Sequence, residues 1–182
     1  MSASLNLCQV GFMSARLVFL SLGHRFVVPV FDHFTAEVTR YMVPRPPRTL
    51  GEARDMVADT VDAMRVGHHL SLAVCSRNQG EFLGCLALNG IGTPTPELGI
   101  WLKGTAQGQG IATEALGSLL AWYQKHYSVD GYVYPADCRN LASCRLAQRL
   151  GGRLARRYME RSLNGYDLQV AEFWIPPVRV KQ

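Results

Sequence analysis

The chain has 182 residues, of which 48% are apolar, so it can bury one substantial core and does not require a second. Its 19 Lys and Arg residues exceed its 14 Asp and Glu residues, but the net charge of +5 is spread thinly, without the interleaved aromatic residues of a nucleic-acid-binding surface. We therefore expect a single domain over residues 1–182, with its core at about 16–175, and no nucleic-acid partner.

The cysteines argue against two classes of site. They are odd in number and none shows the C-x-x-C spacing, so we expect neither a disulfide framework nor a metal site. The apolar stretch Leu17–Phe31 is interrupted by His24, Arg25 and Pro29 and is too short to span a bilayer. The N-terminus also lacks the basic segment of a signal peptide. These features predict a cytoplasmic protein without a membrane partner. The five cysteines are Cys8, Cys75, Cys85, Cys138 and Cys144.

The N-terminal third is predicted to contain a strand at Arg16–Leu22, and a shorter strand around Leu5–Val10. Residues His24–Arg40 combine strand-like and helix-like spacing, and we favour a helix broken at Pro29. A threonine N-cap then precedes a helix over Leu50–Val66.

The rest of the chain alternates strands and helices. Hairpin turns are predicted at Asn78-Gln79-Gly80 and at Asn164-Gly165. This order predicts an α/β protein (mixed α+β), with a mixed, mostly antiparallel sheet of six to seven strands and helices on both faces. The predicted strands are Leu70–Cys75, Phe82–Leu88, Glu97–Leu102, Gly131–Pro135, Arg153–Glu160 and Leu168–Trp174, and the predicted helices are Gly110–Tyr127 and Asn140–Leu150.

The segment from Trp101 to Leu116 predicts a strand, a glycine-rich turn and the start of a long helix. Such a junction binds phosphate, because glycines let an anion approach the peptide N–H groups and the helix adds unpaired donors and the positive end of its dipole. A P-loop is excluded, since no Lys-Ser/Thr pair follows at the required spacing. A dinucleotide fingerprint lacks its third glycine, although Asp130 lies at about the distance of a ribose-binding acid. A plain glycine turn that ends a strand is the alternative.

What fits is Gln107-x-x-Gly110-x-Ala112, which resembles the Q/R-x-x-G-x-G/A pattern of the GNAT (general-control-related N-acetyltransferase) superfamily. A second segment begins Asn140-Leu-Ala-Ser143 and ends Leu-Gly-Gly152. It resembles the N-x-x-S…L-G-F element of the Rim-type branch, the ribosomal-protein N-terminal acetyltransferases and their relatives. The resemblance covers roughly residues 16–174.

The resemblance implies the GNAT fold, with a sheet splayed at the cofactor strand, and acetyl-CoA (coenzyme A) as cofactor. It also places Tyr41 in an acceptor-side helix. Two departures stand out: Ala147 occupies the place of a tyrosine that many GNATs use as general acid, and Gly152 replaces the phenylalanine. The implied cofactor-binding residues are Trp101, Leu102, Lys103, Gln107, Gly108, Gln109, Gly110, Ile111, Ala112, Thr113, Asn140 and Ser143.

The helix after Asn140 admits two interpretations. Offsets of 0, 3 and 7 share one helical face, so Asn140, Ser143 and Ala147 would meet the ligand together. Alternatively, Asn140 is an N-cap and Ser143 has no further role. A basic cluster follows, which is either a solvated face or a site for CoA phosphates: Arg145, Arg149, Arg153, Arg156, Arg157 and Arg161.

The expected reaction is the transfer of an acetyl group from acetyl-CoA to a primary amine, which includes a protein N-terminal α-amine, by direct attack in a ternary complex. We predict Ser143 near the sulfur and Glu97 as general base, directly or through water. An acetyl-cysteine on Cys144 is the alternative route. Competing functions are a non-catalytic acyl-CoA-binding regulatory module and a nucleotide-binding oxidoreductase. The sequence names neither the acceptor amine nor the oligomeric state, which could be a homodimer.

Overall fold

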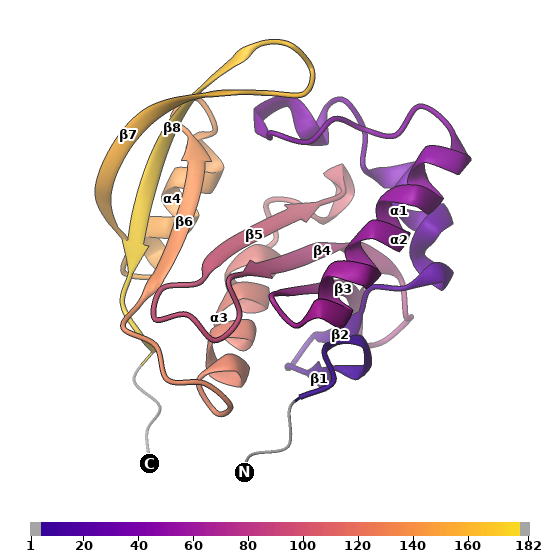
Figure 1. Ribbon diagram of the computed structural model, residues 1–182, viewed down its shortest axis with the longest axis horizontal. Coiled ribbons are helices and arrows are strands. Elements are labelled where there is room, and N and C mark those ends of the chain that lie inside the picture. Colours follow the sequence, from indigo (N-terminus) through magenta and orange to yellow (C-terminus); the bar gives the residue numbers. More distant parts are fainter. Residues whose placement is uncertain (1–4, 179–182) are drawn as a thin grey trace.

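A computed structural model describes residues 5–178 of the protein (Figure 1). Eight strands form one sheet in the order β1-β2-β3-β4-β5-β6-β8-β7. All neighbouring pairs are antiparallel except β5 and β6, which are parallel. The strands are β1 (Gly11–Met13), β2 (Leu17–Ser21), β3 (His69–Ser76), β4 (Phe82–Asn89), β5 (Glu97–Leu102), β6 (Tyr132–Asp137), β7 (Arg153–Arg161) and β8 (Asp167–Ile175).

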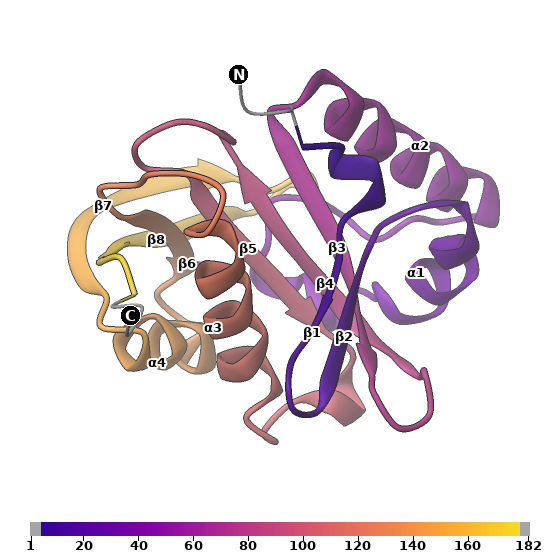
Figure 2. The ribbon, with the colours of Figure 1, turned by 90° about the horizontal axis from the view of Figure 1, so that it is seen from below.

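Helices cover both faces of this sheet. Helices α1 and α2 lie on one face and α3 and α4 on the other (Figure 2). Apolar side chains of α3, Leu116, Leu119 and Leu120 with Tyr123, are buried in the core as their spacing predicts. Within the described residues, no helix combines the length and the apolar character needed to cross a bilayer. The helices are α1 (Val27–His33), α2 (Leu50–Val66), α3 (Ile111–Tyr123) and α4 (Leu141–Arg149).

The structure confirms the mixed, mostly antiparallel sheet and corrects it near the N-terminus. Residues Leu7–Gln9 form a 3-10 helix, and the additional strand lies at Gly11–Met13, which brings the sheet to eight strands where we expected six to seven. The short strand is apolar enough to pair but too short to show periodicity, so its place could not be read from the sequence.

The predicted break at Pro29 is wrong. Pro29 is the third residue of α1, which continues to His33. The N–H groups of the first helical turn have no partner inside a helix, so a proline there removes no hydrogen bond. By contrast, α2 begins as predicted: the Thr49 hydroxyl accepts a hydrogen bond from the Glu52 N–H, 3.1 Å away.

Two helices end earlier than the sequence suggested. Helix α3 stops at Tyr123 instead of Tyr127, and α4 runs from Leu141 to Arg149 with Asn140 outside it as N-cap. After Tyr123 the backbone tightens into turns, since the N–H groups of Lys125 and His126 donate to carbonyls three residues back. Both predicted hairpins are present, and glycines with positive φ, Gly80 and Gly165, occupy their turns.

The sheet divides between β5 and β6. These strands pair at a single position, Glu97 opposite Val133, and then diverge (Figure 1). At the far end, the tip of the β7–β8 hairpin is fastened to the loop that precedes α2. The Leu163 N–H donates to the Val43 carbonyl (2.8 Å), and the Tyr166 hydroxyl donates to the Arg40 carbonyl (2.6 Å). The β5–β6 pairing therefore closes one end of the opening, and these hydrogen bonds close the other.

Candidate active site

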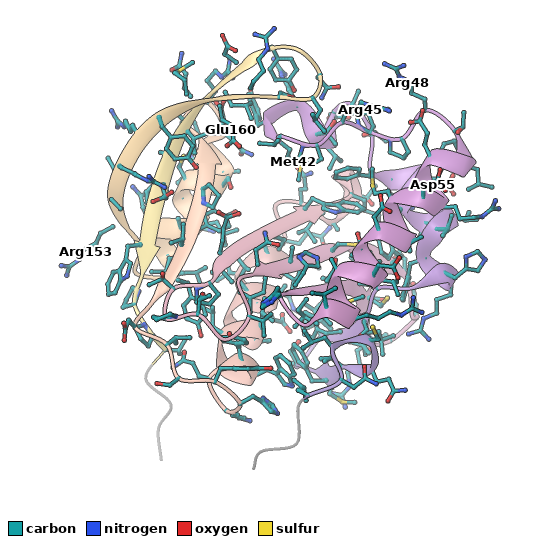
Figure 3. All side chains as sticks on the ribbon, in the orientation of Figure 1. Met42, Arg45, Arg48, Asp55, Arg153 and Glu160 are labelled. Carbon is teal, nitrogen blue, oxygen red and sulfur yellow. The ribbon has the colours of Figure 1, made fainter. Side chains whose placement is uncertain are left out.

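A cavity of about 800 Å³ occupies the opening between β5 and β6. It reaches both faces of the sheet, since its walls come from α3 and α4 on one side and from β7, β8 and the loop before α2 on the other. Figure 3 shows Met42 and Glu160 directed into this space from the loop and from β7. The predicted site residues that line it are Tyr41, Glu97, Trp101, Leu102, Gln107, Gly108, Gly110, Ile111, Ala112, Thr113, Asn140 and Ser143.

The glycine turn has the backbone that the motif predicted. Gly108 and Gly110 have φ of +74° and +75°, a conformation that L side chains rarely adopt. Gly110 is the N-cap of α3. The N–H groups of Ile111, Ala112 and Thr113 start that helix, so none has an intrahelical partner. This end of the cavity therefore presents a row of donors suited to an anion.

Two predicted cofactor-binding residues, Lys103 and Gln109, do not line the cavity. Lys103 is buried and its ammonium forms an ion pair with Glu81. The Gln109 side chain donates to the Thr105 carbonyl, 2.7 Å away. Both side chains are therefore engaged by other groups of the protein. Gln107, which does line the cavity, similarly donates to the Leu102 carbonyl at 2.9 Å.

The direction of the β5 backbone decides which peptide groups face the opening. The Lys103 N–H donates to the Leu83 carbonyl, so it points toward β4. Peptide groups alternate in direction along a strand, and those of Ile100 and Leu102 therefore point to the edge that β6 leaves exposed. Leu102, a predicted cofactor-binding residue, therefore presents its N–H to the cavity. Ile100, which was not predicted, presents its N–H in the same direction.

Arg16 and Glu114 support the turn, and the sequence analysis missed both. The Arg16 guanidinium lies 2.6 Å from the Glu114 carboxylate and donates to the Gln109 carbonyl at 3.1 Å. Burial alone would raise the pKa of Glu114, but hydrogen bonds from Ser14 and Arg16 lower it overall. This pairing neutralises a carboxylate in the first turn of α3, where it would otherwise repel an anion.

Asn140, the N-cap of α4, and Ser143, in the first turn of that helix, both line the cavity. The Asn140 amide oxygen accepts from the Ser143 N–H at 3.1 Å, so Asn140 is an N-cap. The Ser143 hydroxyl lies 2.7 Å from the hydroxyl of Tyr134. Burial raises the pKa of Tyr134 to about 12, with a smaller opposing effect from the Ser143 hydrogen bond. The expectation that Ala147 also meets the cavity is wrong: Ala147 is fully buried, and Leu146 lines the cavity instead.

Two carboxylates, those of Glu97 and Glu160, line the cavity, as do Tyr41 and Tyr158. Glu97 is half-buried, and burial, together with the nearby carboxylates of Glu160 and Glu172, raises its pKa. Glu172 is paired with Arg156 at 2.7 Å, whereas no ion pair within residues 5–178 engages Glu97 or Glu160.

Cys144 does not line the cavity. Its thiol points to the Asp137 carbonyl, with the sulfur 3.7 Å from the oxygen, and burial raises its pKa. A thiol in this state is a poor nucleophile, because the thiolate is the reactive form. Within the described residues, no three His, Cys, Asp or Glu side chains gather to hold a metal ion.

The predicted basic cluster divides between two surroundings. Arg145 and Arg149 project from α4 into the wall of the cavity. Arg156 and Arg161, on β7, form ion pairs with Glu172 and Asp167. Arginine is well suited to phosphate recognition, and Arg145 and Arg149 are the members of the cluster that line the cavity.

Comparison with known proteins identifies this arrangement. A model of the acetyltransferase (GNAT) domain matches residues 25–153, which is more than half of the chain. The chain belongs to the GNAT acetyltransferase family. No curated protein matches it in sequence.

Solved acetyltransferase structures share the fold of this protein. A RimL ribosomal-protein α-N-acetyltransferase is 23% identical, with a TM-score of 0.78, and the match covers 90% of this chain and 91% of that one. An enzyme from Salmonella typhimurium that modifies the N-terminal serine of a 50S ribosomal protein is 22% identical, with a TM-score of 0.77 over 91% and 96% of the two chains. RimL in complex with coenzyme A is 20% identical, with a TM-score of 0.76 over 90% and 95%.

Proposed function

We propose that this GNAT protein is an acetyl-CoA-dependent N-acetyltransferase that acetylates a primary amine, with the α-amine of a protein N-terminus as acceptor. The observation that carries the proposal is the cavity through the sheet, which joins a row of anion-binding N–H groups on one face to two carboxylates on the other. All of residues 1–182 would act as one acetyltransferase domain.

The anion-binding end would hold the cofactor. The turn Gln107–Thr113 would bind the pyrophosphate, with Arg145 and Arg149 available to the remaining phosphate. The peptide N–H groups of β5 that face the opening would bind the pantetheine chain and polarise the thioester carbonyl. Asn140 caps α4 and so fixes the position of Ser143, which would donate to the sulfur as negative charge develops there.

The carboxylate end would receive the amine. An α-amine has a pKa of about 8 and is partly neutral at physiological pH, whereas a lysine amine at about 10.4 is almost entirely protonated. Glu97 would remove the proton, directly or through water, and its raised pKa makes it a stronger base than an ordinary glutamate. The structural relatives that modify ribosomal-protein N-termini support an α-amine as acceptor.

Direct attack in a ternary complex is favoured over a covalent acetyl-enzyme. One continuous cavity would receive both substrates, and Cys144, the alternative nucleophile, lies outside its lining. Initial-rate plots should therefore intersect, and Cys144→Ala should keep most of the activity. Parallel lines together with an inactive Cys144→Ala would restore the acetyl-cysteine route.

The decisive experiment measures release of the CoA thiol from acetyl-CoA against a panel of amines that includes peptides with varied N-terminal residues. We expect release that depends on peptide and is highest for a subset of N-termini. Binding of acetyl-CoA, seen as a rise in melting temperature, without release for any amine would instead support a regulatory acyl-CoA-binding module. Stabilisation by NAD but not by CoA would indicate an oxidoreductase.

A further inference from the structure

The hydroxyl groups of Tyr134 and Ser143 form an isolated pair in the wall of the cavity. They lie 2.7 Å apart, and each is the other's hydrogen-bond partner among the side chains described. Tyr134 comes from the middle of β6 and is 3% exposed, while Ser143 comes from the first turn of α4. The pair therefore connects the centre of the sheet to the helix that lines the cofactor end.

The neighbouring tyrosine sharpens the contrast. Tyr132 lies two residues earlier on β6, on the same side of the strand, and is fully buried. Its hydroxyl is buried without a hydrogen-bond partner, and Tyr132 does not line the cavity. The hydroxyl of Tyr134 is thus distinguished from a similar one nearby by its partner and by its position at the cavity.

Hydrogen-bond accounting assigns a direction to the pair. Each hydroxyl has one hydrogen to donate. The Ser143 N–H is already used by Asn140, so the hydroxyl is the group that Ser143 can offer to the cavity. If that hydroxyl donates to a ligand, the hydrogen between the two oxygens must come from Tyr134. Burial raises the pKa of Tyr134 to about 12, so the tyrosine keeps this hydrogen at physiological pH.

We propose that Tyr134 is a positioning residue: it donates a hydrogen bond to the Ser143 hydroxyl and thereby directs the Ser143 O–H toward the sulfur of bound coenzyme A. The proposal rests on the acetyl transfer proposed above. When the amine attacks, the C–S bond breaks, its electron pair remains on sulfur, and the thiolate accepts the Ser143 hydrogen bond. No proton leaves Tyr134. Two hydrogen bonds in series also polarise each other, which strengthens the donor that the sulfur meets.

A titration of the bound thiol tests the proposal without any acceptor amine. The thiolate of CoA absorbs in the ultraviolet, and complexes with desulfo-CoA provide the baseline for the protein's own cysteines. In the wild type, the bound CoA thiol should have a lower pKa than free CoA. Tyr134→Phe and Ser143→Ala should each reduce the thiolate fraction at a given pH by about two- to tenfold, the range of one hydrogen bond. The double variant should lose little more, because the tyrosine acts through the serine.

Tyr132→Phe is the matched control. It removes the same atom from the same strand, away from the cavity, and should leave the thiol pKa unchanged. In steady-state assays, Tyr134→Phe should lower kcat with little change in the KM for acetyl-CoA, since the interaction strengthens as charge develops. Melting temperatures of the two variants identify any general loss of stability.

Three outcomes would overturn the proposal: a bound thiol pKa that is the same in Tyr134→Phe and wild type, an equal change in Tyr132→Phe, or additive effects of Tyr134→Phe and Ser143→Ala. Failure of the proposed function is seen separately. Bound CoA with a lowered thiol pKa but no acetyl transfer to any amine would refute the enzyme and retain the positioning role, whereas absence of CoA binding would refute both.

Discussion

The amide oxygen of Asn140 accepts a hydrogen bond from the backbone N–H of Ser143, 3.1 Å away. Asn140 thereby caps α4 and fixes the position of Ser143, whose side chain faces the cavity. The motif was open to two interpretations, a helix cap and a ligand-binding residue. The contacts give the first role to Asn140 and leave the second to Ser143. Asn140 has a structural role that the contacts define, while Ser143 turns its side chain to Tyr134 and the cavity.

We therefore expect different phenotypes for the two residues. Asn140→Ala should destabilise the protein by about 1 kcal/mol, the usual effect of a lost N-cap, and Asn140→Asp should restore stability because a carboxylate also caps. Ser143→Ala should keep its melting temperature and lose about ten- to a thousandfold in kcat. Thermal unfolding and steady-state kinetics of all three variants measure these effects. A fully active Ser143→Ala would remove the hydroxyl from the mechanism.

The glycine turn gives a second prediction. Gly110→Ala should weaken acetyl-CoA binding and destabilise the protein by about 1–2 kcal/mol, because the added Cβ is strained at a φ of +75°. The matched control is Gly104→Ala, in the same turn but without positive φ and with no atom within 4 Å of the added Cβ. The shift in melting temperature produced by acetyl-CoA should shrink in Gly110→Ala and stay intact in Gly104→Ala. Equal shifts in both would argue against anion binding by this turn.

Arg16 provides a third prediction through its contacts with Glu114 and the Gln109 carbonyl. Arg16→Ala should raise the KM for acetyl-CoA several-fold and leave kcat nearly unchanged, because it loosens the turn and leaves a carboxylate unpaired near the bound phosphates. Arg65→Ala, which breaks an exposed ion pair with Asp62 on α2, is the control and should change neither constant. An unaltered KM in Arg16→Ala would show that the glycine turn keeps its shape without Arg16.

Local elements could be predicted from the sequence, whereas residues that depend on long-range contacts could not. The strand, turn and helix at Glu97–Tyr123 were readable because two glycines and a helical repeat specify them locally. Arg16 could not be recognised, since its partner Glu114 lies 98 residues away and an isolated arginine carries no pattern. Tyr134 was hidden for the same reason: on a buried strand it looks like any core aromatic residue until the fold brings α4 against it.

Gly152 illustrates a departure that the fold explains. A phenylalanine is usual at this place in the Rim-type pattern, but here a Cβ would lie 2.6 Å from the Ala147 carbonyl oxygen, a backbone atom that cannot move away freely. The sequence showed the missing aromatic residue but not the close approach that excludes it. Because residue 152 is glycine, β7 can start directly against the end of α4. The Gly152 N–H donates to the Ala147 carbonyl there, at 2.9 Å.

A fourth prediction follows from this contact. Gly152→Ala should destabilise the protein by about 1–3 kcal/mol, the range for overpacking in a close-packed region. Gly117→Ala, inside α3 with no atom within 4 Å of the added Cβ, should instead be neutral or stabilising, because alanine loses less backbone entropy in a helix. Denaturant unfolding compares the two directly. A Gly152→Ala protein as stable as the wild type would mean that β7 can shift away from α4.

A fifth prediction concerns the pH dependence of kcat that Glu97 sets. Burial and the carboxylates of Glu160 and Glu172 raise its pKa, so the base form is lost, and kcat falls, at a higher pH than for an ordinary glutamate. Glu160→Gln removes one of those negative charges, which should lower the pKa of Glu97 and move the acid limb of the kcat profile to lower pH. Asp62→Asn, an equal loss of charge on the exposed surface of α2, should leave the limb in place.

The raised pKa of Glu97 makes it a better base, but it also means that the charged carboxylate destabilises the folded protein. A carboxyl whose pKa is higher in the folded state binds its proton more tightly there, so the charged form destabilises the fold above that pKa. Glu97→Gln should therefore abolish most of the activity and, at neutral pH, raise the melting temperature, as expected where a functional charge is held in an unfavourable place. The gain should disappear as the pH falls and wild-type Glu97 becomes protonated. A Glu97→Gln variant that melts below the wild type at neutral pH would show that the charged carboxylate stabilises the fold. That outcome would contradict a raised pKa for Glu97.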